Sequence, residues 1–147
     1  DWRFFGIGST GAARQVDLGG GRSLELLPRT GQEEYGRLLA GHDVGLALMD
    51  APHPSLVPIE MASAGTVCVT STYGNSKTAP KLEALSGNLV AAEPTVEGVA
   101  GALQRAVERS GDLELRVEQS AVDWPDDWDT AFDEKLVSSI IERLDPR

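Results

Sequence analysis

The stretch "GHDVGLALMDAPHPSLVPIEMASAGTVCVTSTYGNSK", residues 41–77, carries most of the information about the fold of this chain. It contains an almost continuous apolar run at 43–49, a proline-rich corner, a segment of small residues and a second apolar run at 66–71. Unbroken apolar runs are typical of strands in a parallel sheet that helices cover on both faces. The stretch therefore predicts a strand, a short helix at 58–64 and a second buried strand.

The alternation of strand and helix continues on either side of this stretch. From the period of their apolar residues we expect strands at 2–7, 23–27 and 88–92 and helices at 32–40, 80–85, 96–109 and 128–144. Thr30 is expected to cap the first helix, and Pro58 to occupy the first position of its own helix. The pattern predicts an α/β fold, a doubly wound and mostly parallel sheet with helices on both faces. Such folds bind ligands at the carboxyl ends of their strands.

The overall composition restricts the class of function. The chain has 147 residues, 41% of them hydrophobic, which suits one α/β domain with a substantial core. The formal net charge of −10 disfavours nucleic acid as a partner, because phosphate backbones are bound by basic patches. No apolar run approaches the roughly 20 residues of a transmembrane helix. The two histidines lack the spacing of a metal site, so we expect no metal.

The single cysteine, Cys68, lies in an apolar segment that is expected to be a strand. Because the chain has no second cysteine, Cys68 can form no internal disulfide, and we expect a small buried residue. An unpaired thiol fits a reducing, cytoplasmic setting.

One glycine-rich loop matches the dinucleotide-binding motif. The sequence GIGSTG at residues 6–11 is a literal G-x-G-x-x-G directly after an expected strand, where such a loop cradles a pyrophosphate at a helix N-terminus. Only residues 12–18 separate it from three consecutive glycines, which is too short for a crossover helix of about 10 residues. A nicotinamide-dinucleotide site, with Glu25 near the expected ribose position, stays open as an alternative to a flexible loop whose backbone N–H groups approach a phosphate.

One glutamate stands within the apolar surroundings of the opening stretch. Glu60 follows the proline-rich corner and falls in the first turn of the expected helix. A carboxylate there can cap free backbone N–H groups and is favoured by the helix dipole. At the carboxyl end of a strand it can equally accept two hydrogen bonds from vicinal hydroxyl groups, such as those of a ribose. The residues alone leave both interpretations open.

The succession at 41–77 resembles the C-terminal, nucleotide-sugar-binding domain of GT-B fold glycosyltransferases. In that family a strand and a proline-rich loop are followed by a P-x-E-x-x-A-x-G helix and a V-V-T strand. The stretch is similar above all to the rhamnosyltransferase-like branch that builds bacterial surface glycans, in which a P-H-P-S-x-x-P-x-E-M-A sequence and a later N-x-K type loop recur. The resemblance extends over roughly residues 24–107 and is specific between 43 and 77.

The resemblance implies roles for the proline-rich corner and the helix after it. The glutamate that matches Glu60 binds the ribose of the donor, and the loop that matches His53, Pro54 and Ser55 lies beside the donor sugar and the pyrophosphate. Many relatives carry an acid eight residues before this glutamate, where the present chain has Pro52. The contact of that acid with the donor sugar therefore does not carry over. Whether His53 contacts the donor or stiffens the loop stays open.

The resemblance also implies a phosphate-binding region. Lys77 matches a basic residue near the donor phosphates, and Asn75 lies in the same loop; Gly8 with Ser9 is a weaker candidate for the same phosphates. A cation there would stabilise the negative charge that the leaving nucleoside diphosphate gains as the glycosidic bond breaks. The resemblance therefore implies transfer without a metal ion or another cofactor.

By this resemblance, residues 1–147 form one donor-binding domain of a glycosyltransferase that moves a sugar from a nucleoside diphosphate to a growing glycan. Rhamnose and a deoxythymidine-diphosphate donor are the candidates, with retention of anomeric configuration. Because the chain starts at Asp1 without methionine, we expect the C-terminal half of a longer cytoplasmic protein, which the rest of the chain could place at the inner face of the membrane.

The missing N-terminal domain would hold the glycan acceptor, so this part alone is expected to be inactive. The terminal helix, within 126–147, is expected to pack toward that domain. Two rival functions remain open: an NAD(P)-dependent oxidoreductase that uses Gly6 to Gly11, and a non-enzymatic α/β binding module in which the helix at Pro58 is merely capped.

Overall fold

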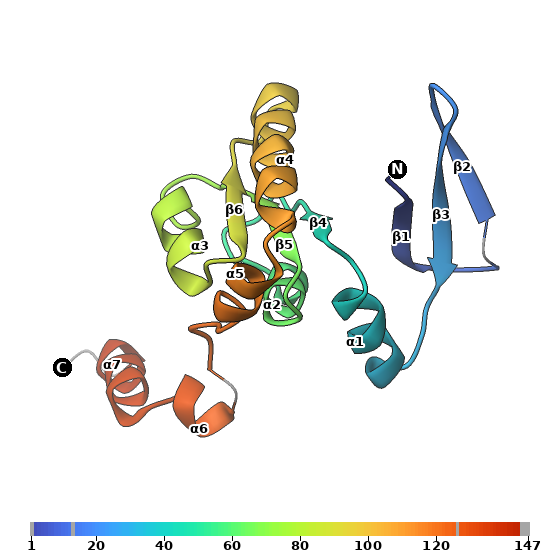
Figure 1. Ribbon diagram of the computed structural model, residues 1–147. Helices are drawn as coiled ribbons and strands as arrows, with labels where there is room; N and C mark the ends of the chain where they lie inside the picture. The colour runs from blue at the N-terminus through green and yellow to red at the C-terminus, as the bar shows by residue number, and fades with distance from the viewer. Residues whose placement is uncertain (1, 13, 126, 145–147) are drawn as a thin grey trace. The chain divides into compact units, whose positions relative to one another are not determined.

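Strands and helices follow one another along the chain in a computed structural model that describes residues 2–12, 14–125 and 127–144 (Figure 1). The chain divides into two units, Asp1–His42 and Asp43–Arg147, each with its own three-stranded sheet. We describe each unit by itself, and the single domain expected from the sequence stays a prediction.

The first unit is a small mixed sheet followed by one helix. Its strands are β1 (Phe4–Ser9), β2 (Arg14–Gly19) and β3 (Arg22–Pro28), in the order β1-β3-β2, and its helix is α1 (Gln32–Ala40). Strand β3 runs parallel to β1 and antiparallel to β2. The sequence interpretation missed β2, because all six of its residues are exposed and no buried face gives it a strand period.

The ends of α1 test the expected caps. The helix ends before Gly41, as predicted, but its N-cap is Gly31 rather than Thr30. The prediction of a Thr30 cap is therefore wrong: the extended backbone continues one residue further, and no side chain caps the helix.

The second unit is a parallel sheet between helices. Strands β4 (Val44–Ala47), β5 (Val67–Ser71) and β6 (Leu89–Ala92) are parallel and lie in this order. The helices are α2 (Leu56–Ser63), α3 (Ala79–Leu85), α4 (Val96–Ser110) and α5 (Leu113–Glu118). Of these, the short α5 was not predicted.

Two apolar clusters occupy the two faces of this sheet. One joins Val67, Val69 and Val90 of the strands to Ala102 and Ala106 of α4. The other consists of Ala62 of α2, Cys68 of β5 and Leu89 of β6, with Leu85 of α3 packed against it. Because successive side chains of a strand point to opposite faces, β5 supplies both clusters. Helices therefore cover both faces, and the predicted α/β fold of the doubly wound, Rossmann-like type is confirmed (Figure 1).

Cys68, a residue of strand β5, is completely buried, and its side chain lies on the face of the sheet that α2 covers. Its Sγ lies 3.6 Å from Sδ of Met61, and burial raises the pKa of the thiol to about 12. The prediction of a small buried residue is confirmed, since a thiol with so high a pKa stays protonated at neutral pH.

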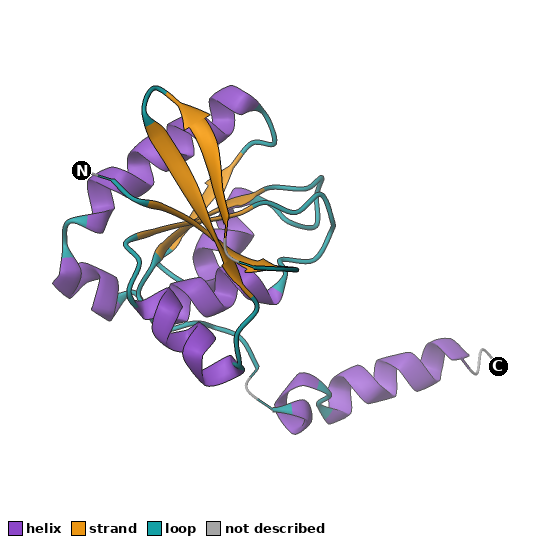
Figure 2. Ribbon diagram, turned by 90° about the vertical axis from the view of Figure 1, so that its right-hand side faces the viewer, coloured by secondary structure: helices purple, strands orange, loops and turns teal. Residues whose placement is uncertain are grey.

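The C-terminal helix expected at 128–144 is divided in two. Helix α6 (Trp128–Ala131) and helix α7 (Glu134–Leu144) are separated by a short loop (Figure 2). Asp133 accepts a hydrogen bond of 2.7 Å from the backbone N–H of Leu136 and so starts α7 anew. A regular spacing of apolar residues continues across this break, which explains why the sequence predicted one helix. Among the described residues, no helix has the length and the apolar character needed to cross a membrane.

Candidate functional site

The chain leaves strand β4 through Met49, whose backbone is held by two polar side chains. The hydroxyl of Ser71 accepts a hydrogen bond from the Met49 N–H (3.1 Å) and donates one to the Met49 carbonyl (3.0 Å). Nζ of Lys77 donates to the same carbonyl at 2.7 Å. These bonds join the carboxyl ends of β4 and β5 and fix the direction in which the loop at 50–55 departs.

Lys77 is almost completely buried, at 2% exposure. Its backbone pairs with that of Tyr73 in an isolated antiparallel bridge, and Asn75 lies at the exposed tip of the loop between them. Lys81 supports the tip by donating to the Asn75 carbonyl at 3.0 Å. Burial lowers the pKa of Lys77, and the nearby carboxylate of Asp50 opposes this effect in part. The structure thus places a buried lysine, hydrogen-bonded to a backbone carbonyl and near Asp50, beside the carboxyl ends of the strands.

Replacing Lys77 with methionine is expected to change how stability depends on pH. Between the lowered folded-state pKa of Lys77 and the pKa of an unfolded lysine, about 10.4, the unfolded chain binds more protons than the folded chain. The free energy of unfolding of the wild type should therefore rise with pH through this window, relative to that of Lys77→Met. Urea unfolding at several alkaline pH values measures the difference. Lys81→Met, at an exposed lysine, is the matched control, and parallel profiles for wild type and Lys77→Met would contradict the prediction.

The loop reaches helix α2 through a residue in an unusual backbone conformation. Ser55 is the N-cap of α2 and has a φ of 71°. Among the described residues it is the only non-glycine residue with a positive φ. This conformation costs an L-residue roughly 1–3 kcal/mol, and such strained residues cluster at functional sites. It turns the chain sharply, so that α2 begins at Leu56, two residues earlier than predicted. The prediction of Pro58 at the first helical position is therefore wrong, although Pro58 still lies in the first turn, where its missing N–H leaves no bond unmade.

The earlier start of α2 changes the interpretation of Glu60. The residue lies in the second turn, beyond the free N–H groups of the helix end, so it does not act as a cap. Its side chain is exposed, and within the described part of the chain its carboxylate makes no hydrogen bond or ion pair. Glu60 thus presents two free acceptor oxygens on the helix that follows the carboxyl end of β4.

A hollow of about 370 Å³ lies beside this helix start. Four consecutive residues line it, His53 to Leu56, and Trp124 completes the wall. The structure therefore brings together the predicted residues His53, Pro54 and Ser55 and adds Trp124, which was not among the predicted site residues. Leu56 precedes Glu60 by one helical turn, so the two side chains lie on the same face of α2.

The remaining predicted residues, Gly8 and Ser9, belong to the first unit. They lie at the carboxyl end of β1, and Gly8 has a φ of 94°, which a glycine adopts without strain. The motif continues to Gly11 and is followed by strand β2, not by a helix. Because a dinucleotide site places the pyrophosphate at a helix N-terminus, the geometry that this motif requires is missing from the described residues.

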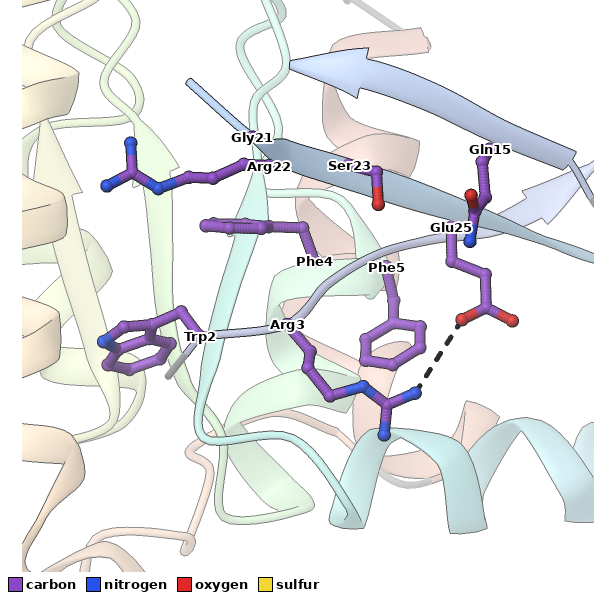
Figure 3. Close-up of a pocket in the computed structure, with 9 residues that line it drawn as sticks. All are labelled: Trp2, Arg3, Phe4, Phe5, Gln15, Gly21, Arg22, Ser23 and Glu25. Atoms are coloured by element: carbon purple, nitrogen blue, oxygen red, sulfur yellow. Dashed lines mark ion pairs between the residues drawn. The ribbon is translucent and has the colours of Figure 1, made fainter. Parts of the chain in front are cut away.

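The first unit also contains an open hollow of about 780 Å³. Figure 3 shows the side chains that line it, among them Arg3 beside Phe5 and Glu25. The guanidinium of Arg3 lies 4.8 Å from the centre of the Phe5 ring and 3.8 Å from a Glu25 oxygen. The sequence analysis expected most of these residues in strands and named Glu25 only near the ribose position of the dinucleotide alternative. None of the expected donor-binding residues lines this hollow. In the described ranges, no group of three or more histidine, cysteine, aspartate or glutamate side chains could hold a metal ion.

Comparison with known proteins identifies the family. The model of the family described as "WsaF, C-terminal domain" matches residues 1–104. The chain belongs to this family. The match contains every predicted site residue of this WsaF-type domain, whereas Trp124 lies beyond it.

A similar curated protein is the "O-antigen biosynthesis protein RfbC" of Myxococcus xanthus. It is 36% identical to this chain over 101 residues, which are 69% of the chain. The WsaF-type domain spans only 7% of the length of this relative.

Proposed function

We propose that this chain is the donor-binding domain of a glycosyltransferase in glycan synthesis. The family match and the relative named for O-antigen biosynthesis support a glycosyltransferase-like domain that takes part in glycan synthesis. The observation that carries the finer assignment is Glu60: among the described residues its carboxylate is exposed and without a partner, in the helix that follows the carboxyl end of β4 and whose first residue, Leu56, lines a hollow. Ligands of α/β folds bind at the carboxyl ends of such strands.

Each residue of the site has a task in this proposal. The two oxygens of Glu60 accept hydrogen bonds from the vicinal hydroxyl groups of the ribose, an arrangement that a carboxylate favours. Lys77 keeps two N–H donors besides the one that binds the Met49 carbonyl, and Asn75 lies in its loop. A bound diphosphate would restore the pKa of Lys77, because a nearby anion favours the charged form.

The positive charge of Lys77 would act in the sugar-transfer step. The bond between C1 of the donor sugar and the phosphate oxygen breaks, and this oxygen keeps the electron pair. An acceptor hydroxyl forms the new bond to C1 and releases its proton. Lys77 then stabilises the charge gained by the nucleoside diphosphate without a metal ion, and His53, Pro54 and Ser55 surround the sugar. GT-B architecture and retention of configuration are parts of the same proposal.

The rest of a longer protein would supply what this domain lacks. A glycan acceptor would bind an N-terminal domain. The present domain by itself would bind the donor without transferring its sugar. A deoxythymidine-diphosphate sugar carrying rhamnose is the proposed donor. Such a protein would work in the cytoplasm, with the membrane face as the site of glycan assembly.

Calorimetric titration with a panel of nucleoside diphosphates tests this function. We expect one of them to bind, and Glu60→Gln to weaken it by about 10- to 100-fold, because a hydrogen bond to a charged group contributes about 1.5–3 kcal/mol. Glu83→Gln, at an exposed glutamate of α3, is the matched control and should leave the affinity unchanged.

Two outcomes would count against the proposal. If no nucleoside diphosphate binds the wild type, the donor-binding function is wrong, and binding of NAD instead would favour the oxidoreductase alternative. If a diphosphate binds with equal affinity to wild type and Glu60→Gln, the ribose assignment of Glu60 is wrong.

A further inference from the structure

We infer that Ser71 is a positioning residue of the donor site: its hydroxyl fixes the Met49 carbonyl, and this carbonyl sets where the ammonium of Lys77 lies. Ser71 is the last residue of β5, directly before the loop that carries Lys77. The inference rests on the proposed function and deepens it, because it adds a residue that controls the binding of the diphosphate without contacting it.

Ser71 is anchored on one side of β5 and supports the chain on the other. Its backbone is in register with Ala92 of β6, as part of the parallel ladder. The ladder between β5 and β4 ends one residue earlier, at the pair of Thr70 and Ala47. Beyond that pair the side chain of Ser71 takes over, because its hydroxyl bonds both the N–H (3.1 Å) and the carbonyl (3.0 Å) of Met49. The Met49 backbone is therefore held by a residue that is itself fixed in the sheet.

The hydroxyl of Ser71 is not available to a ligand. Its single O–H donor is used on the Met49 carbonyl, and one of its acceptor sites takes the Met49 N–H. The residue is only 4% exposed, so the remaining lone pair is shielded. An effect of Ser71 on binding must therefore be transmitted through Met49.

The side chain of Lys77 depends on the same carbonyl. A lysine has a flexible four-carbon stem, so the backbone of Lys77 does not by itself determine where the ammonium lies. The bond of 2.7 Å from Nζ to the Met49 carbonyl does, and it leaves the other N–H donors for the diphosphate. Without the bonds to Ser71 this carbonyl could turn, and the ammonium would move with it. A misplacement of about 1 Å can lower the rate of an enzyme about 100-fold, so a small shift should already weaken the contact.

A second serine makes the same kind of contacts away from the candidate site. Ser86 is also 4% exposed, and its hydroxyl accepts from the Asn88 N–H (3.2 Å) and donates to the Gln119 carbonyl (2.6 Å). It lies shortly before β6, at the amino ends of the parallel strands, whereas Ser71 lies at their carboxyl ends. Ser86→Ala therefore removes equivalent bonds outside the site and is the matched control.

Calorimetric titration of the 147-residue chain tests the inference. The probe is whichever of deoxythymidine, uridine, guanosine and adenosine diphosphate binds the wild type most tightly. Ser71→Ala should weaken its binding about tenfold, while Ser86→Ala should change it by less than about twofold. Thermal unfolding should show a similar fall of the melting temperature for both variants, because each leaves one backbone N–H and one carbonyl without the hydroxyl.

A double-mutant cycle shows whether the effect passes through Lys77. Lys77→Met by itself should weaken the probe about tenfold, because it removes a charge-assisted hydrogen bond to the diphosphate. If Ser71 acts by positioning the ammonium, adding Ser71→Ala to Lys77→Met should weaken the probe by less than about a further twofold. A serine that served only the stability of the fold would lower the affinity by the same factor in both backgrounds.

The contrary outcomes separate this inference from the proposed function. Unchanged binding in Ser71→Ala would overturn the inference, and so would an equal loss in Ser86→Ala, which would indicate a general effect of stability. An undiminished loss in the Lys77→Met background would overturn it as well, since the effect would then bypass the ammonium. In each of these cases, weaker binding of the probe to Glu60→Gln would leave the proposed function standing. If no nucleoside diphosphate binds the wild type, both the function and the inference fail.

Discussion

Replacing Asn88 with aspartate is expected to destabilise the second unit by about 3–5 kcal/mol at neutral pH. Asn88 is completely buried, and its Nδ2 donates to the carbonyls of Ala62 (3.2 Å) and Arg116 (2.7 Å). Its Oδ1 has no hydrogen-bond partner among the described residues. Aspartate would lose both N–H donors and place a carboxylate opposite two carbonyl oxygens. Urea unfolding followed by circular dichroism measures the loss.

The pH dependence of this variant identifies the cause. A carboxyl group in that position would have a folded-state pKa above its unfolded value of about 3.9, because burial and the facing carbonyls disfavour the charged form. The loss of stability should be smaller in acid, where the protonated carboxyl group can still donate one hydrogen bond, and should grow as the pH rises from the unfolded pKa to the folded pKa. Asn75→Asp makes the same chemical change at an exposed position and is the control. A loss at Asn88 that does not vary with pH would indicate a change of packing instead of a buried charge.

Replacing Arg116 with methionine should lower the free energy of unfolding of the second unit by about 2–4 kcal/mol. Arg116 is 8% exposed, and its guanidinium donates to the carbonyls of Gly65 (2.8 Å) and Ser110 (3.1 Å) and to Oδ1 of Asp43 (2.8 Å). These acceptors belong to the loop before β5, the end of α4 and the residue that precedes β4. Methionine fills a similar volume but offers no donor, so it removes the bonds that hold three segments together. Chemical unfolding measures the effect.

Two further variants make this prediction specific. Arg105→Met removes a hydrogen bond to the Ala91 carbonyl, at 3.0 Å, and should lower the free energy of unfolding clearly less. Arg116→Lys should recover only part of the stability, because an ammonium cannot reproduce the planar, forked geometry of a guanidinium. If Arg116→Met is no less stable than Arg105→Met, the bonds to Gly65, Ser110 and Asp43 contribute little.

Much of the second unit could be predicted from the sequence, because its signals are local. Strands β4, β5 and β6 are short apolar runs, and α4 repeats its apolar residues at helical spacing. Strand β2 and helix α5 were missed for the opposite reason. The residues of β2 are all exposed, and the six residues of α5 are too few to establish a period.

The candidate site was predictable only in part. The proline-rich corner and Glu60 stand out in the sequence because a charge within an apolar run and a cluster of prolines are visible without a fold. The exact start of α2 was not, because it depends on the positive φ of Ser55, a conformation more often associated with glycine. This difference of two residues moved Glu60 from a capping position to a free one.

The sequence by itself determined the order of β4, α2, β5, α3, β6 and α4 in the second unit and the two-sided burial of its sheet. Those properties follow from residue type and short-range spacing. Only the tertiary structure decided that Lys77 is buried against the Met49 carbonyl, that Arg116 meets Gly65, and that Trp124 joins His53 in one hollow. These contacts join residues far apart in the chain, 28 and 51 positions for the first two, and no local pattern of residues encodes such a pairing.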